Sequence, residues 1–482
     1  MLRIPDDFFQ EELRDGYFIS EMMKRCWAVQ LGILDSISKL CDKYGLRYFA
    51  DYGTLLGAVR HKGYVPWDDD LDITMPRKDF MTFLEHGDEI GDGLTVRSIY
   101  SSETYMNFNA VVTHKADTLR WDDERMEKNY GCPFICYVDV FPWDYVPRDR
   151  EKQMLQRQLF SPAYKLMYEL RNIEDVINSG RTMSLNELRN SEFFRYPKIR
   201  EFISECELLT ALFKEHLLAE VTIDPKKKLR QQLCIAADRA ASMCPGEDAD
   251  YMEYAPVFSG ESIHHPRRRK EWLEATVDLP FEFGTIKVPA EYEKVVVSQY
   301  GEGYKEPVRF SASHGFPFYR DEIRVLIGGD TGEILGDKPL SDPSVEAIPL
   351  QIREFLLQEN GSLKRIILYG LSATDIVNNG INGIRKIRDC LDAMVREENV
   401  VVFVFVPEAL REFMEKCSLS MYAEYVDMLG KIALMDNVIL DENPESGMLW
   451  TLISICDEYF GDRCRLEEIC RKYGVPVTIQ DY

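Results

Sequence analysis

The sequence predicts an α/β protein made of two units, a mixed-sheet domain with a helical insertion and a smaller parallel-sheet domain. Three observations indicate this. Helix-period and strand-period segments alternate irregularly over roughly the first 145 residues. Residues from about 149 to 275 are mostly helical in pattern and rich in long charged side chains. From residue 363 onward strands and helices alternate regularly, which favours parallel strands joined by crossover helices.

The first unit is predicted to begin with an amphipathic helix over residues 18–44. Its apolar side chains recur close to a 3.6-residue period, and Gly45 provides a C-cap. After a short strand at 47–50 we expect a loop that contains Gly53. The alternation in Asp70-Leu71-Asp72-Ile73 is typical of a half-buried strand. The remaining expected elements are a helix at 78–90 and strands at 94–100, 107–114 and 134–141.

The later part of the chain is predicted to return to the first domain and then to enter a linker. Residues 281–319 are aromatic and punctuated by Gly and Pro, and the stretch 328–345 is rich in Gly, Pro, Ser and Asp. The expected division is a first domain over 1–325 with its insertion at about 149–275, a linker over 326–362, and a second domain over 363–482.

The second domain is predicted to have a Rossmann-like fold. Val400–Val406 is almost continuously apolar, as expected of a strand buried on both faces. Further strands are expected at 363–369, 438–440, near Cys456 and at 476–480. Helical segments lie between them, so we expect a parallel sheet with crossover helices.

Composition excludes several classes of function. The 482 residues carry 82 acidic and 58 basic side chains, a net charge of −24, which argues against broad binding to nucleic acid or anionic membranes. The longest apolar run is far shorter than the roughly 20 residues that span a bilayer, and the acidic N-terminal stretch lacks a secretory pattern. The twelve cysteines show no CxxC pair and no zinc-like Cys/His spacing. We therefore expect free thiols and a cytoplasmic location.

The main chemical signal is PWDDDLDI (66–73), which places four aspartates within five positions. In a strand, Asp70 and Asp72 project to one face while Leu71 and Ile73 enter the core. Two carboxylates about 7 Å apart along a strand repel each other unless a cation lies between them, and Mg²⁺ prefers such oxygen ligands. The alternative is an acidic turn on a solvated edge.

Two other segments add to this signal. Asp139 is a third carboxylate in an apolar strand, YVDV. Gly53 is followed by Thr54, a pair that lets a backbone approach a phosphate closely. The basic run PRRRK (266–270) is interpreted as a solvated loop or, alternatively, as an anion contact.

These motifs together resemble the LicD family, which has a nucleotidyltransferase fold and includes the fukutin proteins. The resemblance is carried by YFADYGTLLGAVRHKGYVPWDDDLDI (48–73), YVDVFPWD (137–144) and FEFGTIKVPAEYEKVVVSQYGEGYKEP (281–307), and it covers roughly residues 17–320. Residues 456–482 resemble, over a short stretch, the closing segment of GT-B glycosyltransferases and CDP-glycerol glycerophosphotransferases. Phe405-Val406-Pro407-Glu408 stands where such enzymes often carry a basic motif, so we interpret the second domain as accessory.

The resemblance implies transfer of a phospho-alcohol group, such as phosphocholine, from a CDP-alcohol donor to a glycan or glycolipid acceptor, with release of CMP. On this chain it implies that Asp70, Asp72 and Asp139 are catalytic and bind Mg²⁺ or Mn²⁺. It also implies donor contacts from Gly53, Thr54, Arg60, Lys62 and His314. For the basic residues, a solvated turn is the alternative interpretation.

Two other functions remain open from the sequence. A nucleotidyltransferase would use the same three carboxylates but would release pyrophosphate. A non-catalytic glycan-binding protein would keep the fold without turnover. In each case we expect no nucleic-acid partner and no transmembrane segment, with peripheral association with membrane glycan machinery as a further expectation.

Overall fold

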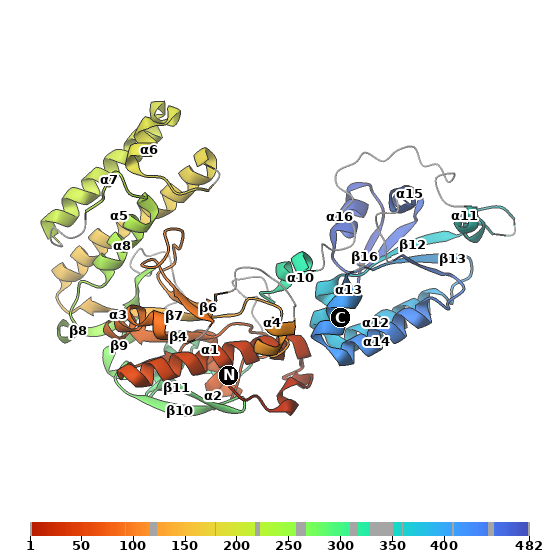
Figure 1. Cartoon of the computed structure of the whole chain (residues 1–482), viewed down its shortest axis with the longest axis horizontal. Coiled ribbons are helices and arrows are strands. Elements are labelled where there is room, and N and C mark those ends of the chain that lie inside the picture. Colours follow the sequence, from red (N-terminus) through yellow and green to blue (C-terminus); the bar gives the residue numbers. More distant parts are fainter. Residues whose placement is uncertain are drawn as a thin grey trace.

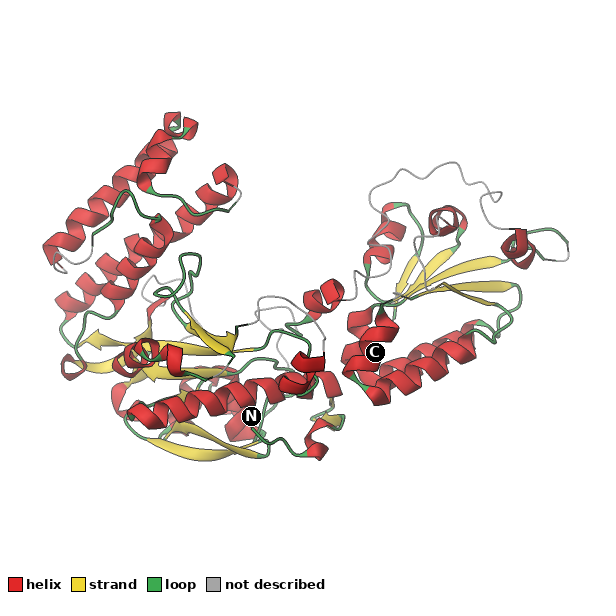
Figure 2. Ribbon diagram, viewed as in Figure 1, coloured by secondary structure: helices red, strands yellow, loops and turns green. Residues whose placement is uncertain are grey.

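The computed structural model is built on two large sheets, each flanked by helices (Figures 1 and 2). The predicted α/β class, with one mixed and one parallel sheet, is confirmed. The structure describes residues 2–91, 93–115, 123–178, 180–216, 222–256, 267–308, 317–326, 350–358, 360–406, 409–441 and 448–480. Within these residues, no helix combines the length and the apolar character needed to cross a bilayer.

The first domain is built on a seven-stranded sheet in the order β3-β4-β7-β6-β5, with β8 and β9 continuing from β7. The central pair β4 and β7 is parallel, and all other neighbours are antiparallel. The strands are β3 (Phe49–Ala50), β4 (Asp72–Pro76), β5 (Leu94–Arg97), β6 (Ala110–His114), β7 (Tyr137–Pro147), β8 (Ala249–Tyr254) and β9 (Arg268–Arg269). Two hairpins lie outside this sheet, β1 (Glu12–Arg14) with β2 (Tyr17–Ile19), and β10 (Thr276–Phe281) with β11 (Gly284–Pro289).

Helix α1 (Glu21–Tyr44) lies along the first sheet and closely matches the predicted helix (Figure 1). The Ser20 hydroxyl accepts a hydrogen bond from the amide of Met23, and Gly45 ends the helix with a φ of 65°. Both caps satisfy backbone groups that a helix end leaves unpaired. The other described helices around this sheet are α2 (Tyr52–Arg60), α3 (Arg77–Glu85), α4 (Asp123–Lys128), α9 (Tyr292–Tyr300) and α10 (Arg320–Leu326).

Two local predictions were wrong. The expected loop at Gly53 is the first turn of α2, because the Asp51 side chain caps this helix by accepting from the Tyr52 amide. The strand expected to include Asp70 begins at Asp72 instead, because the residues before it form a loop.

The helical insertion projects from one end of the first sheet (Figure 1). Its helices are α5 (Arg150–Asn178), α6 (Leu185–Asn190), α7 (Pro197–His216) and α8 (Leu229–Ala241). The chain then rejoins the sheet through β8 and β9, which lie inside the interval predicted as the insertion. The domain boundaries themselves stay a prediction, since most of the expected linker falls outside the described residues.

The second domain has a five-stranded parallel sheet in the order β14-β13-β12-β15-β16. Numbered within the domain, this is the order 3-2-1-4-5, which matches the first five strands of the doubly wound Rossmann fold. Its strands are β12 (Arg365–Gly370), β13 (Val400–Phe405), β14 (Val438–Asp441), β15 (Glu458–Gly461) and β16 (Val477–Ile479). Its helices are α11 (Leu350–Leu356), α12 (Ala373–Met394), α13 (Leu410–Cys417), α14 (Leu419–Ile432), α15 (Met448–Ile455) and α16 (Arg465–Lys472). Helices α12 and α14 cover one face, and α15 and α16 cover the other (Figure 1).

The N-terminus of α12 is occupied by a side chain of the same domain. A carboxylate oxygen of Asp462 accepts a hydrogen bond from the amide of Ser372 at 2.7 Å, and both residues are buried. In dinucleotide-binding folds this helix end receives the phosphates. The structure therefore offers no support for a nucleotide site there.

The two domains are joined by polar contacts as well as by a shared apolar core. The Tyr319 hydroxyl donates to the Asn378 side chain at 2.9 Å, and the Ser418 hydroxyl donates to Glu21 of α1 at 2.5 Å. The second domain thus packs against the helix that supports the first sheet.

Candidate active site

Two of the predicted acidic residues lie side by side on the central parallel strands. Asp72 opens β4 and pairs in register with Asp139 of β7. Neighbouring strands are about 4.8 Å apart, and residues in register on parallel strands point to the same face of the sheet. Asp72 is 9% exposed, and Leu71 and Ile73 beside it are fully buried. The alternation in the sequence therefore places one carboxylate from each strand at one point of the sheet.

The loop before β4 brings further carboxylates to the same place. Oxygen atoms of Asp68, Asp69 and Asp70 all lie within 4.8 Å of one another. Helix α1 fixes the backbone of this loop, because the Trp27 indole donates to the carbonyl of Asp68 at 3.2 Å and the Gln30 amide donates to that of Asp69 at 2.8 Å. The loop is thus held through its main chain, and also through the buried carboxylate of Asp69, which accepts a hydrogen bond from the amide of Phe318.

The site crowds negative charge in a partly dry environment. Burial, together with the charges of Asp70 and Asp139, raises the pKa of Asp72 well above its usual value. Burial and the charge of Asp70 likewise raise the pKa of Asp68. Like-charged groups at such distances resist joint ionisation unless a cation neutralises them. Carboxylate oxygens are the ligands that Mg²⁺ and Mn²⁺ prefer, so this donor set fits the expected metal.

Thr54 and Gly53 contact the acidic segment directly, from the first turn of α2. The Thr54 hydroxyl accepts a hydrogen bond from the amide of Asp72 at 2.9 Å, and its side chain is buried. A β-carbon placed on Gly53 would come within 2.1 Å of a carboxylate oxygen of Asp68. Both residues therefore help to position the aspartates, and the donor-phosphate contact that the sequence predicted for them stays a prediction.

Gly53→Ala is expected to lower activity by about a hundredfold, because displacing a catalytic group by about 1 Å has an effect of that size. The added methyl group must push the Asp68 carboxylate aside. Gly430→Ala is the matched control, since Gly430 lies in α14 and an added β-carbon there meets no atom within 4 Å. Turnover assays of both variants check this. Equal turnover rates for the Gly53→Ala and Gly430→Ala variants would show that the Asp68 carboxylate can move without loss of activity.

Neighbouring side chains form hydrogen bonds to the carboxylates of Asp51 and Asp139. Asp51 accepts hydrogen bonds from the hydroxyl of Thr74 at 2.6 Å and from the guanidinium of Arg268 at 2.7 Å. The Asn109 amide donates to the carboxylate of Asp139. Partial burial and the charges of Asp51, Asp68 and Asp72 raise the pKa of the Tyr300 phenol, so it stays a hydrogen-bond donor beside the site.

Sequence reasoning missed the positioning roles of Arg268 and Asn109. Arg268 lies in the basic run that was interpreted as a solvated loop or an anion contact, yet it is fully buried and its anion is Asp51. The position of Arg268 in a basic run was the only signal in the sequence, and it does not indicate that the partner is Asp51. Asn109 carries no motif at all.

The basic residues predicted as donor contacts make other contacts. The Arg60 guanidinium donates a hydrogen bond to the carbonyl of Tyr304 at 2.9 Å. Lys62 lies exposed in a turn, and its backbone carbonyl accepts a hydrogen bond from the amide of Glu282. Arg60 lies six residues after Thr54 on α2, about 9 Å along the helix. His314 lies outside the described residues. The donor roles of these three residues stay predictions.

Comparison with known proteins points to the same part of the chain. Residues 45–174 match the family model described as LicD/FKTN/FKRP, nucleotidyltransferase domain, and this interval contains α2, β4 and β7. The chain is 30% identical over 131 residues to the lipopolysaccharide cholinephosphotransferase LicD of Haemophilus influenzae, which covers 25% of this chain and 44% of that protein. It is 37% identical over 71 residues to an uncharacterized protein of Rickettsia typhi, covering 14% and 23% of the two chains. A similar match to an uncharacterized protein of Rickettsia prowazekii has 45% identity over 47 residues, 10% and 18% of the two chains. The chain thus spans less than half the length of these relatives.

Proposed function

We propose, from the LicD-family nucleotidyltransferase domain that this chain carries over residues 45–174, that the protein is a LicD-type phosphotransferase. It transfers a phospho-alcohol group, such as phosphocholine, from a CDP-linked donor to a hydroxyl of a cell-surface glycan or its precursor. The observation that supports this best is the pairing of Asp72 with Asp139 in a crowded acidic site inside the matched interval. The similarity to the lipopolysaccharide cholinephosphotransferase of Haemophilus influenzae supports choline phosphate as the transferred group.

In this proposal Asp70, Asp72 and Asp139 hold the Mg²⁺ or Mn²⁺, and Asp68 joins them because its carboxylate lies against that of Asp70. When bound, the metal neutralises charge on the non-bridging oxygens of the transferred phosphate. Asp139 receives the proton of the acceptor hydroxyl, and the Asn109 amide holds its carboxylate in place for this step. The attacking oxygen forms a bond to phosphorus as the bond to the CMP oxygen breaks, so CMP leaves and no covalent enzyme intermediate is needed.

The test is a product assay with the full chain. The protein is incubated with Mg²⁺ and a panel of CDP-alcohols, and the release of CMP is followed by chromatography. Metal-dependent CMP release, lost with EDTA and restored by Mg²⁺ or Mn²⁺, is the expected result. A parallel incubation with nucleoside triphosphates and sugar or alcohol acceptors reports pyrophosphate, which would instead favour a nucleotidyltransferase. A chain that binds a glycan but releases neither product would overturn the enzyme proposal.

The second domain is proposed as an accessory domain for acceptor recognition. The accessory role is supported by the buried contact of Asp462 at the N-terminus of α12, which leaves the usual phosphate position of such folds filled by protein and so argues against a nucleotide site in this domain. Action at the cytoplasmic side of the membrane glycan machinery, by peripheral association, is part of the same proposal.

A further inference from the structure

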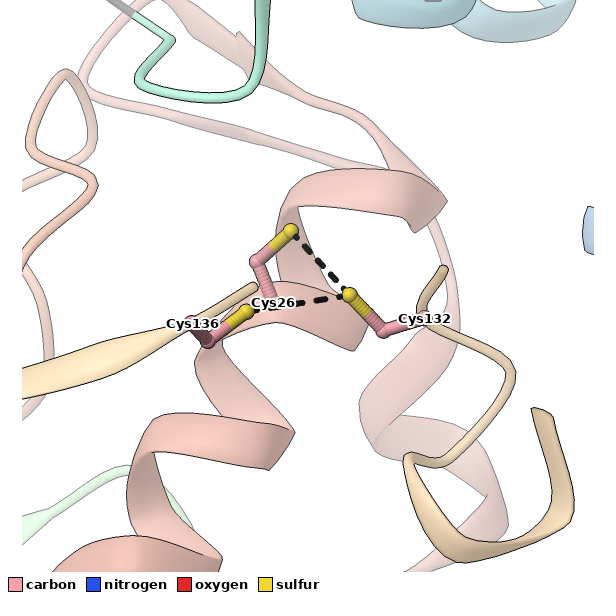
Figure 3. A group of neighbouring side chains, drawn as sticks. All are labelled: Cys26, Cys132 and Cys136. Atoms are coloured by element: carbon pink, nitrogen blue, oxygen red, sulfur yellow. Dashed lines mark hydrogen bonds between the residues drawn. The ribbon is translucent and has the colours of Figure 1, made fainter. Parts of the chain in front are cut away.

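Three buried cysteines converge in the first domain. Cys26 lies on α1, and Cys132 and Cys136 lie in the segment that leads into β7. The sulfur atoms of Cys26 and Cys132 are 3.7 Å apart, as are those of Cys132 and Cys136, and all three lie within 4.8 Å of one another. Figure 3 shows the three thiol groups turned toward a common point. Each of the three side chains is at most 2% exposed.

The size of this sulfur triangle matches a metal–thiolate centre. A triangle with sides of 3.7, 3.7 and at most 4.8 Å has a point equidistant from its corners at no more than about 2.4 Å. A zinc–thiolate bond is about 2.3 Å long. An ion at that point would bond to all three sulfurs with little movement of the protein.

The cluster is distinct from ordinary burial of cysteine. Cys41, Cys206 and Cys234 are also buried, but among the described residues the cysteine group that offers three converging ligand atoms is the one formed by Cys26, Cys132 and Cys136. Its members come from segments 106 residues apart in the chain. A dry setting surrounds it, since the ring of Phe134 stacks on that of Tyr319 at 4.5 Å and both are fully buried.

We propose that Cys26, Cys132 and Cys136 bind one thiophilic d¹⁰ cation, Zn²⁺ or Cu⁺, through three thiolates. Soft sulfur ligands select these ions over Mg²⁺ and Mn²⁺, so this centre is chemically separate from the carboxylate site. Binding forms three metal–sulfur bonds and releases the three thiol protons to solvent. An ordinary cysteine thiol has a pKa of about 8.5 and is mostly protonated at neutral pH, so the release of these protons on binding is measurable.

The bound ion would tie helix α1 to the start of β7. Cys136 is three residues before Asp139, the carboxylate that pairs with Asp72. Helix α1 also holds the loop that carries Asp68 and Asp69. The cation therefore has a structural role, in which it fixes the relative position of the two segments that bring the acidic residues together.

The test uses the full chain with Zn²⁺ or Cu⁺, each in competition with a chromophoric chelator, and the two arms decide between the ions. We expect one equivalent of one ion per chain, thiolate-to-metal charge-transfer absorption and proton release. Cys26→Ala and Cys136→Ala are expected to weaken binding at least tenfold. Cys41→Ala is the matched control, because Cys41 lies on the same helix and is equally buried. Asp72→Asn should also keep the site, which separates it from the carboxylate cluster.

Several results would overturn the proposal. One is the absence of stoichiometric binding of either ion. A second is equal affinity for the ion in the Cys26→Ala and Cys41→Ala variants. A third is a disulfide among the three cysteines in protein purified without reductant. If a variant fails to fold, the wild-type chain still decides. Its unfolding temperature must rise when the ion is added in the presence of saturating Mg²⁺, because the two ions bind at separate sites.

Discussion

Asp72→Asn is expected to abolish turnover and, in the absence of metal, to raise the unfolding temperature of the protein. The loss of activity follows because Asp72 is proposed to hold the metal between β4 and β7. We expect the rate to fall at least a hundredfold, since removing one group that stabilises charge in the transition state lowers kcat by a factor of about 10² to 10³. The gain in stability follows because the carboxylate is buried beside Asp70 and Asp139. An amide keeps the shape and removes the repulsion.

The sign of this stability change can be worked out from the direction of the pKa shift. The pKa of Asp72 is higher in the folded chain than in the unfolded chain, because burial and neighbouring charges disfavour its ionised form. The folded state therefore binds more protons, and the stability of the metal-free protein falls as pH rises above the usual carboxyl range toward the folded pKa. The wild type loses this contribution over that pH range, whereas the uncharged Asn side chain does not titrate.

The measurement combines turnover with thermal unfolding in EDTA and in Mg²⁺. Mg²⁺ is expected to stabilise the wild type and to have little effect on Asp72→Asn. Asp144→Asn is the control, because Asp144 is also buried, on the neighbouring strand β7, but accepts two hydrogen bonds of 2.6 Å from Arg77. That variant should unfold at a lower temperature. Activity within a few-fold of the wild type in Asp72→Asn would contradict the proposed role.

Local periodicity predicted the parts of this fold that depend on neighbouring residues. The apolar repeat in α1 and the C-cap at Gly45 are determined within a few residues, and both are observed. The alternation around Leu71 and Ile73 correctly indicated which side chains enter the core. The parallel sheet of the second domain followed from the order of its strands and helices.

The positions of side chains that meet across the chain could not be predicted in this way. Gly53 follows a capping aspartate, and a helix start and a turn share that signal, so the sequence alone does not decide between them. The fold brings the three thiols of Cys26, Cys132 and Cys136 together. Their spacing in the sequence is not that of a zinc site, so the sequence did not indicate this cluster. The partner of a buried arginine is likewise set by the fold.

Arg268→Ala is expected to destabilise the first domain by about 3 to 5 kcal/mol, the usual cost of leaving one partner of a buried ion pair alone. Arg268 and Asp51 are both fully buried, 217 residues apart in the sequence, and their charged atoms are 2.7 Å apart. The guanidinium also lies 4.1 Å from the centre of the Trp143 ring, which adds a cation–π contact. Without the arginine, Asp51 keeps hydrogen bonds from the amide of Tyr52 and the hydroxyl of Thr74 but loses its counter-ion.

Urea and thermal unfolding, followed by circular dichroism, check this prediction against the neighbouring residue. Arg269→Ala is the control, because its side chain is 53% exposed and its ion pair with Glu271 is long, at 3.6 Å. Exposed pairs contribute about 0 to 1 kcal/mol, so this variant should unfold almost as the wild type does. The double variant Asp51→Asn/Arg268→Met should recover part of the loss, since neither charge is then left buried alone. If Arg268→Ala and Arg269→Ala unfold alike, the buried pair does not hold β9 to the start of α2, and the support it gives to the acidic site must come from elsewhere.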